Sequence, residues 1–103
     1  MNAENGVKLS TDLSSPLSIP YFLWDEPMTV AEFRDRLKTA SKSERTRLLA
    51  KLMREARDTD VWKFISPAEA WQKWEDIAPQ LGRRRSFWEF LFGMWQKEGL
   101  LGG

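Results

Sequence analysis

Apolar residues recur three or four positions apart in four stretches of the chain, residues 29–39, 41–57, 66–81 and 86–99. This spacing puts the apolar side chains of each stretch on one face of a helix with 3.6 residues per turn. Polar and charged residues occupy most of the positions between them. The pattern therefore predicts four amphipathic helices separated by short connections.

Each predicted helix begins with a Ser or Thr that is followed three positions later by a Glu. The pairs are Thr29 with Glu32, Ser41 with Glu44, Ser66 with Glu69, and Ser86 with Glu89. In such a capping box the hydroxyl accepts the backbone N–H of the Glu, and the carboxylate accepts the backbone N–H of the first residue. Gly82 suits the left-handed conformation that ends a helix, and we expect Pro79 to kink or shorten the turn before it.

The predicted last helix, residues 86–99, is apolar over an unusually wide arc, and we expect the chain to be organised around it. Its large apolar side chains cover about 200° of the helix circumference. They are Phe87, Trp88, Phe90, Leu91, Phe92, Met94 and Trp95. A helix on the surface of a small domain needs an apolar stripe of only ~100° or a little more. Either other helices clasp this one on two sides, or part of its aromatic face is left for a partner.

Two short apolar segments lie outside the predicted helices. Tyr21–Trp24 is too short for a helix, and we favour an arm that folds back to cap the core, because exposed clusters of this size are uncommon on monomers. The alternative is an extended peptide that docks on another protein. Val61–Ile65 is interpreted as a connector whose aromatic side chains plug the core.

These elements predict an all-α protein with a single small domain. Residues 1–19 are polar and lack periodicity, which is typical of a disordered N-terminal tail, and residues 20–101 make up the helical domain. We expect its four short helices to form two antiparallel hairpins joined by the aromatic connector. Stacked hairpins would resemble a pair of α-solenoid repeats, and an irregular bundle fits the sequence equally well.

The composition of the chain excludes several kinds of chemistry. The 103 residues contain no Cys and no His, which removes zinc sites and Ser-His-Asp catalysis. Neighbouring acidic residues do not converge on one point, and no glycine-rich phosphate loop is present. We therefore expect a protein that is not an enzyme and that holds no metal or cofactor. No run approaches the ~18 apolar residues of a membrane span, and the N-terminus lacks a secretory signal, so we expect a cytoplasmic location.

Two groups of basic residues are candidates for contact with an anion or a nucleic acid. Arg83, Arg84 and Arg85 precede the last helix, where free backbone N–H groups favour anions. Arg47, Lys51 and Arg54 stack on one face of the second helix. The structural alternatives are a turn whose Arg stems cover aromatic rings and a solvated helix face, and for the second group we favour the solvated face.

The turn before the last helix also fits part of a helix-turn-helix pattern. Ala78 and Gly82 have its Ala-x-x-x-Gly spacing. Pro79 inside the first helix and Arg83 at a normally apolar position depart from the pattern. The aromatic side chains of the last helix also offer few hydrogen bonds to base edges. Reading of DNA is therefore an alternative function and not the preferred one.

From about Pro20 to Leu101 the chain resembles a group of small, uncharacterised bacterial proteins. The resemblance rests on four segments: Pro20-Tyr21-Phe22-Leu23-Trp24-Asp25, Met53-Arg54-Glu55-Ala56-Arg57, Asp60-Val61-Trp62, and Leu81-Gly82-Arg83-Arg84-Arg85 with Phe87-Trp88-Glu89. Members of that group are often encoded beside nucleotidyltransferase-like toxin genes. The resemblance implies a helical accessory or antitoxin-like protein that binds a neighbour's product, and it assigns no activity and no site residues.

The preferred hypothesis is a non-enzymatic helical module that binds a partner protein, and a homodimer stays open. The residues expected to contact the partner are Tyr21, Phe22, Trp24, Trp88, Phe92 and Trp95. The arginine triplet would pair with acidic groups of the partner. The alternative is a nucleic-acid-binding protein that uses the turn at Arg83–Arg85 in a helix-turn-helix-like arrangement.

Overall fold

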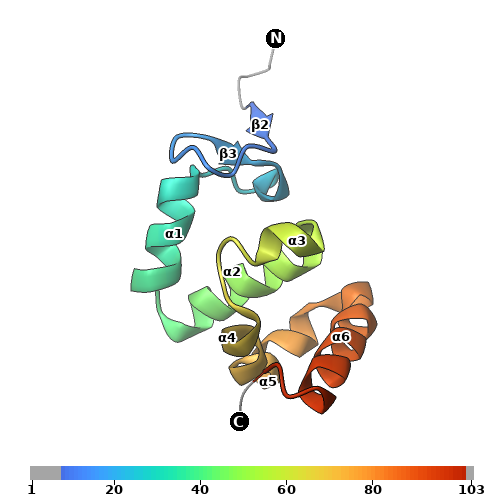
Figure 1. Ribbon diagram of the computed structural model, residues 1–103. Coiled ribbons are helices and arrows are strands. Elements are labelled where there is room, and N and C mark those ends of the chain that lie inside the picture. Colours follow the sequence, from blue (N-terminus) through green and yellow to red (C-terminus); the bar gives the residue numbers. More distant parts are fainter. Residues whose placement is uncertain (1–7, 102–103) are drawn as a thin grey trace.

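The computed structural model describes residues 8–101, and most of this range is helical (Figure 1). Its α-helices are α1 (Val30–Thr39), α2 (Lys42–Glu55), α3 (Asp58–Val61), α4 (Pro67–Gln72), α5 (Trp74–Ile77) and α6 (Arg85–Lys97). The 3-10 turns η1 (Tyr21–Leu23), η2 (Ala78–Gln80) and η3 (Gly82–Arg84) and the short strands β2 (Leu9–Ser10) and β3 (Ile19–Pro20) complete the described elements. The predicted all-α class is confirmed in this broad sense.

The expected arrangement of four helices in two antiparallel hairpins is not confirmed. The first two predicted helices correspond to α1 and α2, but the third is divided into α4, α5 and η2. The division falls at Lys73, whose φ of −101° and ψ of 10° leave the α-helical range. Pro79 lies in the 3-10 turn η2, since a proline removes one N–H from the helical ladder. Residues 58–61 form the single helical turn α3, which the sequence pattern did not predict between residue 57 and the rest of the expected connector.

Three of the four predicted helix starts carry the expected cap. Thr29 and Glu32 form a complete capping box, with the Glu32 N–H donating to Thr29 Oγ1 at 3.1 Å and the Thr29 N–H donating to Glu32 Oε1 at 2.7 Å. Ser41 and Ser66 each accept the backbone N–H three residues on. The fourth cap does not form, because η3 runs directly into α6 and the backbone is already helical at Arg84.

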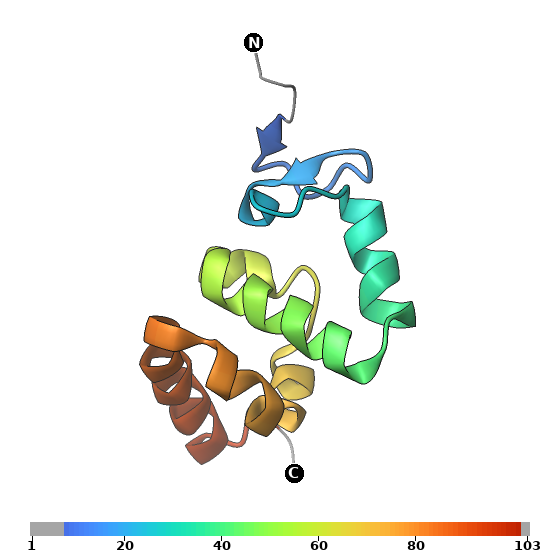
Figure 2. The same cartoon turned by 180° about the vertical axis from the view of Figure 1, so that it is seen from behind.

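The centre of the fold is α2, and not the last helix as we expected from the sequence. Six consecutive residues of α2 are buried, Leu48, Leu49, Ala50, Lys51, Leu52 and Met53. A helix that is buried all round lies in the middle of a core. In both views α1 and α6 lie on opposite sides of α2 (Figures 1 and 2). The apolar face of α6 therefore packs against one side of the core, and α2 lies at the centre of that core.

The segment before the first helix is part of the packed domain from residue 8 onward. Leu9 pairs with Ile19 in a parallel register, and Leu13 is only 3% exposed. The backbone N–H of Val30 donates to the Ser18 carbonyl at 2.8 Å, which ties this segment to the first turn of α1. Residues 8–19 thus differ from the disordered tail expected there, because one buried Leu and a two-residue strand leave no periodic signal in the sequence. Residues 1–7 of that tail lie outside the described range.

Candidate functional site

The aromatic arm at η1 caps the core, as the favoured interpretation of the sequence expected. Phe22 is buried in edge-to-face contact with Phe33, at a centroid distance of 5.4 Å. The hydroxyl of Tyr21 donates to Asp60 Oδ2 at 2.6 Å and accepts the backbone N–H of Arg57 at 2.8 Å. Trp24 is 59% exposed. Of the three partner candidates in this arm, Tyr21, Phe22 and Trp24, it is therefore the one that remains available at the surface.

The hydrogen bond between Tyr21 and Asp60 changes the pKa of both groups. Burial raises the pKa of Tyr21, and the hydrogen bond to Asp60 raises it further. Burial also raises the pKa of Asp60, but the hydrogen bonds from Tyr21 and Lys63 outweigh this and leave that pKa below its usual value. Asp60 is therefore a charged acceptor that anchors the arm to α3, which is a structural role.

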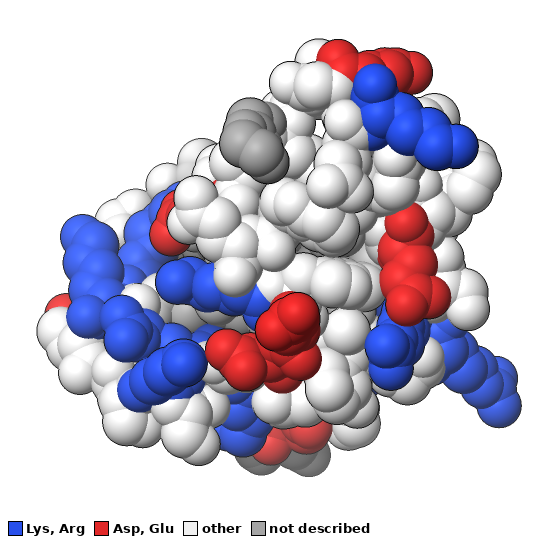
Figure 3. Space-filling model, turned by 90° about the horizontal axis from the view of Figure 1, so that it is seen from below, with Lys and Arg blue, Asp and Glu red and all other residues white. Residues whose placement is uncertain are grey.

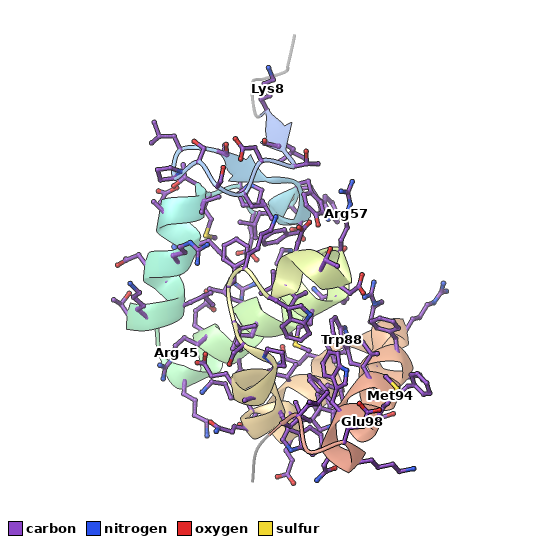
Figure 4. The ribbon with its side chains drawn as sticks, viewed as in Figure 1. Lys8, Arg45, Arg57, Trp88, Met94 and Glu98 are labelled. Carbon is purple, nitrogen blue, oxygen red and sulfur yellow. The ribbon has the colours of Figure 1, made fainter. Side chains whose placement is uncertain are left out.

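The inner face of α6 holds the other partner candidates, and it is packed into the core. Trp88 and Phe92 have no exposed surface, and Trp95 is half-buried. The indole Nε1–H of Trp88 donates to the Met53 carbonyl of α2 at 2.9 Å. Trp88 points from α6 toward the centre of the molecule, and Met94 lies on the other side of the helix (Figure 4). Burial removes Trp88 and Phe92 from any docking surface of this structure.

The outer face of α6 is the exposed apolar surface that the sequence reasoning did not assign. Phe90 is 68% exposed, Phe87 is 39% exposed and Met94 is 38% exposed. A shallow groove of about 380 Å³ runs between Glu89, Phe90, Gly93, Met94 and Lys97. We call these residues together with Phe87 the outer face of α6. On a helical wheel this face lies opposite Trp88 and Phe92, so it can be separated from the buried face once those two residues are known to be buried. The width of the apolar arc alone does not separate the two faces.

The arginine triplet before α6 does not form an open cationic cluster. The Arg84 guanidinium lies over the rings of Phe87 and Trp88, at 4.8 and 5.6 Å from their centroids, and its Nε is buried without an acceptor. Arg85 Nε donates to Glu89 Oε2 at 3.2 Å. Arg83 is exposed and has no ion pair within residues 8–101. The alternative in which an Arg stem covers aromatic rings thus describes Arg84.

The three basic residues of α2 are occupied by nearby acceptors. Lys51 is only 4% exposed and forms ion pairs with Asp25 and Glu26 of the loop after η1. Arg47 reaches Glu26 and Glu44, at 2.8 Å from an oxygen of each. These hydrogen bonds and charges hold the pKa of Asp25, Glu26 and Glu44 below the usual range.

The third residue of this group, Arg54, also has local partners. Its Nη1 donates to the Gln80 carbonyl at 2.9 Å, and its Nε lies 3.0 Å from Glu55. The three residues therefore fasten α2 to the segments beside it. They differ from the solvated face that we favoured, because Lys51 is buried, and they do not form an open cationic surface.

A different basic surface, which sequence reasoning missed, is a cleft of about 270 Å³. Its cations are Arg34, Lys38, Arg45 and Lys73, and its apolar lining consists of Leu37, Leu49, Phe64 and Ile65. We call this set of residues, which also includes Glu69, the basic cleft. Figure 3 shows the largest group of Lys and Arg on the left of the face seen from below, the side on which α1 and the start of α2 lie in Figure 1, and smaller groups on the right. Arg45 is found at the start of α2, close to the end of α1 (Figure 4).

The basic cleft gives little signal in the sequence because its cations come from separate segments. Arg34 and Lys38 belong to α1, Arg45 to α2, and Lys73 follows α4. Only the i, i+4 relation of Arg34 to Lys38 is local, and it is typical of an ordinary solvated helix face. No sequence pattern indicates that these residues meet.

Metal clusters and membrane-spanning helices are two further features that bear on the function of the described part of the chain. Within residues 8–101, no cluster of three or more acidic side chains is arranged to hold a metal ion. In the same range, no helix combines the length and the apolar character needed to cross a membrane. Comparison with protein-family models, with curated proteins and with solved structures gives no match. The outer face of α6 and the basic cleft are therefore the two candidate functional surfaces of the protein.

Proposed function

We propose that this protein is a non-enzymatic interaction module that binds a helix of a partner protein on the outer face of α6. The observation that carries this proposal is the arrangement of Phe90, Gly93, Met94 and Lys97 around the groove. These residues occupy positions i, i+3, i+4 and i+7, which form the hole that receives one side chain of an apposed helix in knobs-into-holes packing.

The centre of the groove is suited to close helix approach. A Cβ atom added at Gly93 would meet nothing within 4 Å, so the space above this residue is open. Phe90 and Met94 line the same groove as the glycine and would lose exposed apolar surface when a helix docks. The contact area of one short helix face is small, which favours a transient complex over a permanent one.

The charges beside the groove indicate an acidic partner. Lys97 lines the groove and has no carboxylate within 4.0 Å in residues 8–101. Glu89 is already paired with Arg85 at 3.2 Å. A partner helix with an apolar stripe flanked by Asp or Glu would therefore complement this surface better than a second copy of α6 would. The resemblance of the sequence to small bacterial proteins that are often encoded beside nucleotidyltransferase-like toxin genes adds a candidate partner, the product of a neighbouring toxin gene.

The test is capture of partners from the native cell with tagged wild-type protein and two variants. Phe90→Asp places a charge in the middle of the outer face of α6, and Leu17→Asp makes the same change at another exposed apolar residue, far from α6 in the sequence. We expect both variants to fold with stabilities within about 0.5 kcal/mol of wild type, because both side chains are mainly exposed. One stoichiometric protein should be retained by wild type and Leu17→Asp and lost from Phe90→Asp.

The captured protein is then purified and mixed with this chain for hydrogen exchange. Slower exchange confined to α6 would support the proposal, because docking buries that helix. Retention of the partner by Phe90→Asp would overturn it. A dimer of wild type alone that Phe90→Asp converts to a monomer would also overturn it, since the occupant would then be a second copy.

The nucleic-acid alternative has less support from the geometry. Of the six basic residues assigned to it, Arg83 alone has neither an ion pair nor a ring or carbonyl contact within the described range. Nucleic acid in the captured material, released by salt or nuclease and absent from an Arg83→Gln variant, would favour this alternative.

A further inference from the structure

We propose that the basic cleft binds a small organic anion that joins a carboxylate or phosphate to a compact apolar group. The cleft is separate from the outer face of α6, and the inference does not depend on the proposed function. It rests on the placement of four cationic side chains around an apolar floor, in a cleft whose size suits a small ligand.

The cations of the cleft lack acidic partners in the described part of the chain, whereas nearby basic residues are paired. Within residues 8–101, Arg34, Lys38, Arg45 and Lys73 have no carboxylate within 4.0 Å. Arg36 and Arg47, on the same two helices, both reach Glu44, at 3.4 and 2.8 Å. Glu69 is the single acidic residue among those that line the cleft. Like charges around one cavity repel each other, and a bound anion would relieve that repulsion.

One cation of the cleft is already held in position. The guanidinium of Arg34 lies over the Phe64 ring at 4.5 Å from its centroid. The Phe64 ring is held in turn by edge-to-face contacts with Phe33 and Phe22, at 5.2 and 5.7 Å. A cation that stacks on a fixed ring loses less conformational freedom when it binds an anion. Arg34 is thus preorganised at the edge of the cleft.

The floor of the cleft indicates that the anion carries an apolar group. Leu49 and Ile65 form its buried part, and Leu37 and Phe64 are half-buried beside them. An inorganic anion would contact the cations and leave this floor in water, whereas an apolar group would cover it. The volume of about 270 Å³ lies near the lower end of small-molecule pockets, which suits a single ring or a short chain.

The test is a titration of ¹⁵N-labelled full-length protein, followed by NMR, with phenyl phosphate and phenylacetate. Inorganic phosphate and phenol are the controls, since each carries half of the required chemistry. We expect the amide shifts to map to Leu37, Leu49, Phe64 and Lys73, and at least one of the two organic anions to bind about tenfold more tightly than inorganic phosphate. The better of the two ligands identifies the anionic group. The affinity for the organic anion should fall several-fold between about 50 and about 200 mM salt, because salt screens the attraction between the anion and the cations of the cleft.

Matched variants locate the site. Arg45→Gln, Lys38→Gln and Lys73→Gln each remove one cation from the cleft, and we expect each to weaken binding about fivefold. Lys38 and Lys73 are exposed, so these two variants keep the test valid if Arg45→Gln disturbs the fold. Lys8→Gln removes one exposed charge far from the cleft and should leave binding unchanged. Equal binding of phenyl phosphate and inorganic phosphate, equal effects of Lys8→Gln and the cleft variants, or shifts that map to α6 would each overturn the proposal.

Discussion

Trp88 is a core residue, although its position in the aromatic arc of the last helix is also compatible with a role in partner binding. Its ring packs edge-to-face against Trp62 at 5.5 Å, and its N–H reaches the Met53 carbonyl on α2. A buried indole needs such an acceptor, because an unpaired N–H would lose its hydrogen bond to water. Trp88 therefore joins α6 to the central helix, and α6 presents other residues to solvent.

Replacing Trp88 by Phe should destabilise the protein by about 2–3 kcal/mol, from lost packing and from the unsatisfied Met53 carbonyl. The matched change Trp24→Phe, at a mainly exposed tryptophan, should cost less than about 0.5 kcal/mol. Urea denaturation followed by circular dichroism measures both. Equal effects of the two changes would contradict the placement of Trp88 in the core.

The carboxylates around Lys51 and Arg47 give stability a predictable dependence on pH. The pKa values of Asp25, Glu26 and Glu44 are lowered in the folded protein, so the unfolded chain binds more protons near pH 4. Their contribution is fully present above the pKa values of the unfolded chain, and it is lost as pH falls through the folded values. We expect the free energy of unfolding to decrease steadily from about pH 5 downward.

The variant Lys51→Met tests the source of this dependence. It removes the ammonium that Asp25 and Glu26 contact and keeps a side chain of similar length. The decrease in stability between pH 5 and pH 3 should be smaller in this variant than in wild type. Lys97→Met removes an exposed cation without an ion pair in the described range and should leave the decrease unchanged. An unchanged pH profile of Lys51→Met would exclude the proposed origin.

At the scale of elements, two glycines have opposite roles around the start and middle of α6. Gly82 has a φ of +53°, a left-handed conformation that side-chain-bearing residues adopt at a cost. Gly93 lies inside α6 with open space around its Cα and lowers helix propensity there. Gly82 permits the turn into α6. Gly93 lowers the stability of the helix, but its lack of a side chain keeps the groove open.

Alanine substitutions should separate these roles. Gly82→Ala should destabilise the protein by about 1 kcal/mol, and Gly93→Ala should stabilise it by about 0.5–1 kcal/mol. Because a methyl group at residue 93 fills the groove, the more stable variant should also retain less of the partner. Thermal unfolding and partner capture measure the two effects. A stabilised Gly93→Ala protein that binds its partner normally would count against docking on this face.

At the scale of the whole molecule, residues 8–19 before α1 cover part of the core next to that helix. Leu13 reaches the core from a stretch with no periodic pattern, while Leu17, four residues later, is 81% exposed. The carbonyls of Pro16 and Ser18 accept N–H groups of the first turn of α1, at 3.0 and 2.8 Å. These contacts satisfy donors at the N-terminus of α1 that would otherwise lack a partner.

We expect Leu13→Ala to destabilise the whole domain by about 2–3 kcal/mol, because it empties a buried site. Leu17→Ala should change stability by less than about 0.5 kcal/mol. A single cooperative denaturant transition, shifted in the first variant and unshifted in the second, would show that this segment folds with the helices. Loss of Leu13 without any effect on stability would restore the expected disordered tail for residues 8–19.

The features that could be predicted from the sequence are local ones. The helix starts at Thr29, Ser41 and Ser66 were predictable, because a cap joins residues three positions apart. The periodic positions of α1 and α2 were predictable for the same reason, since a helix repeats every three to four residues. The lack of Cys and His is a property of the amino-acid sequence itself, and it limits the chemistry available to every site in the chain.

The tertiary structure alone decided which side of each apolar arc is buried and which charges are paired. Tyr21 meets Asp60, Lys51 meets Asp25 and Trp88 meets Met53, partners separated by 39, 26 and 35 residues. The four cations of the basic cleft likewise come from separate segments. No local pattern encodes such meetings, because they depend on how whole helices pack, and packing is decided by the burial of all their faces together.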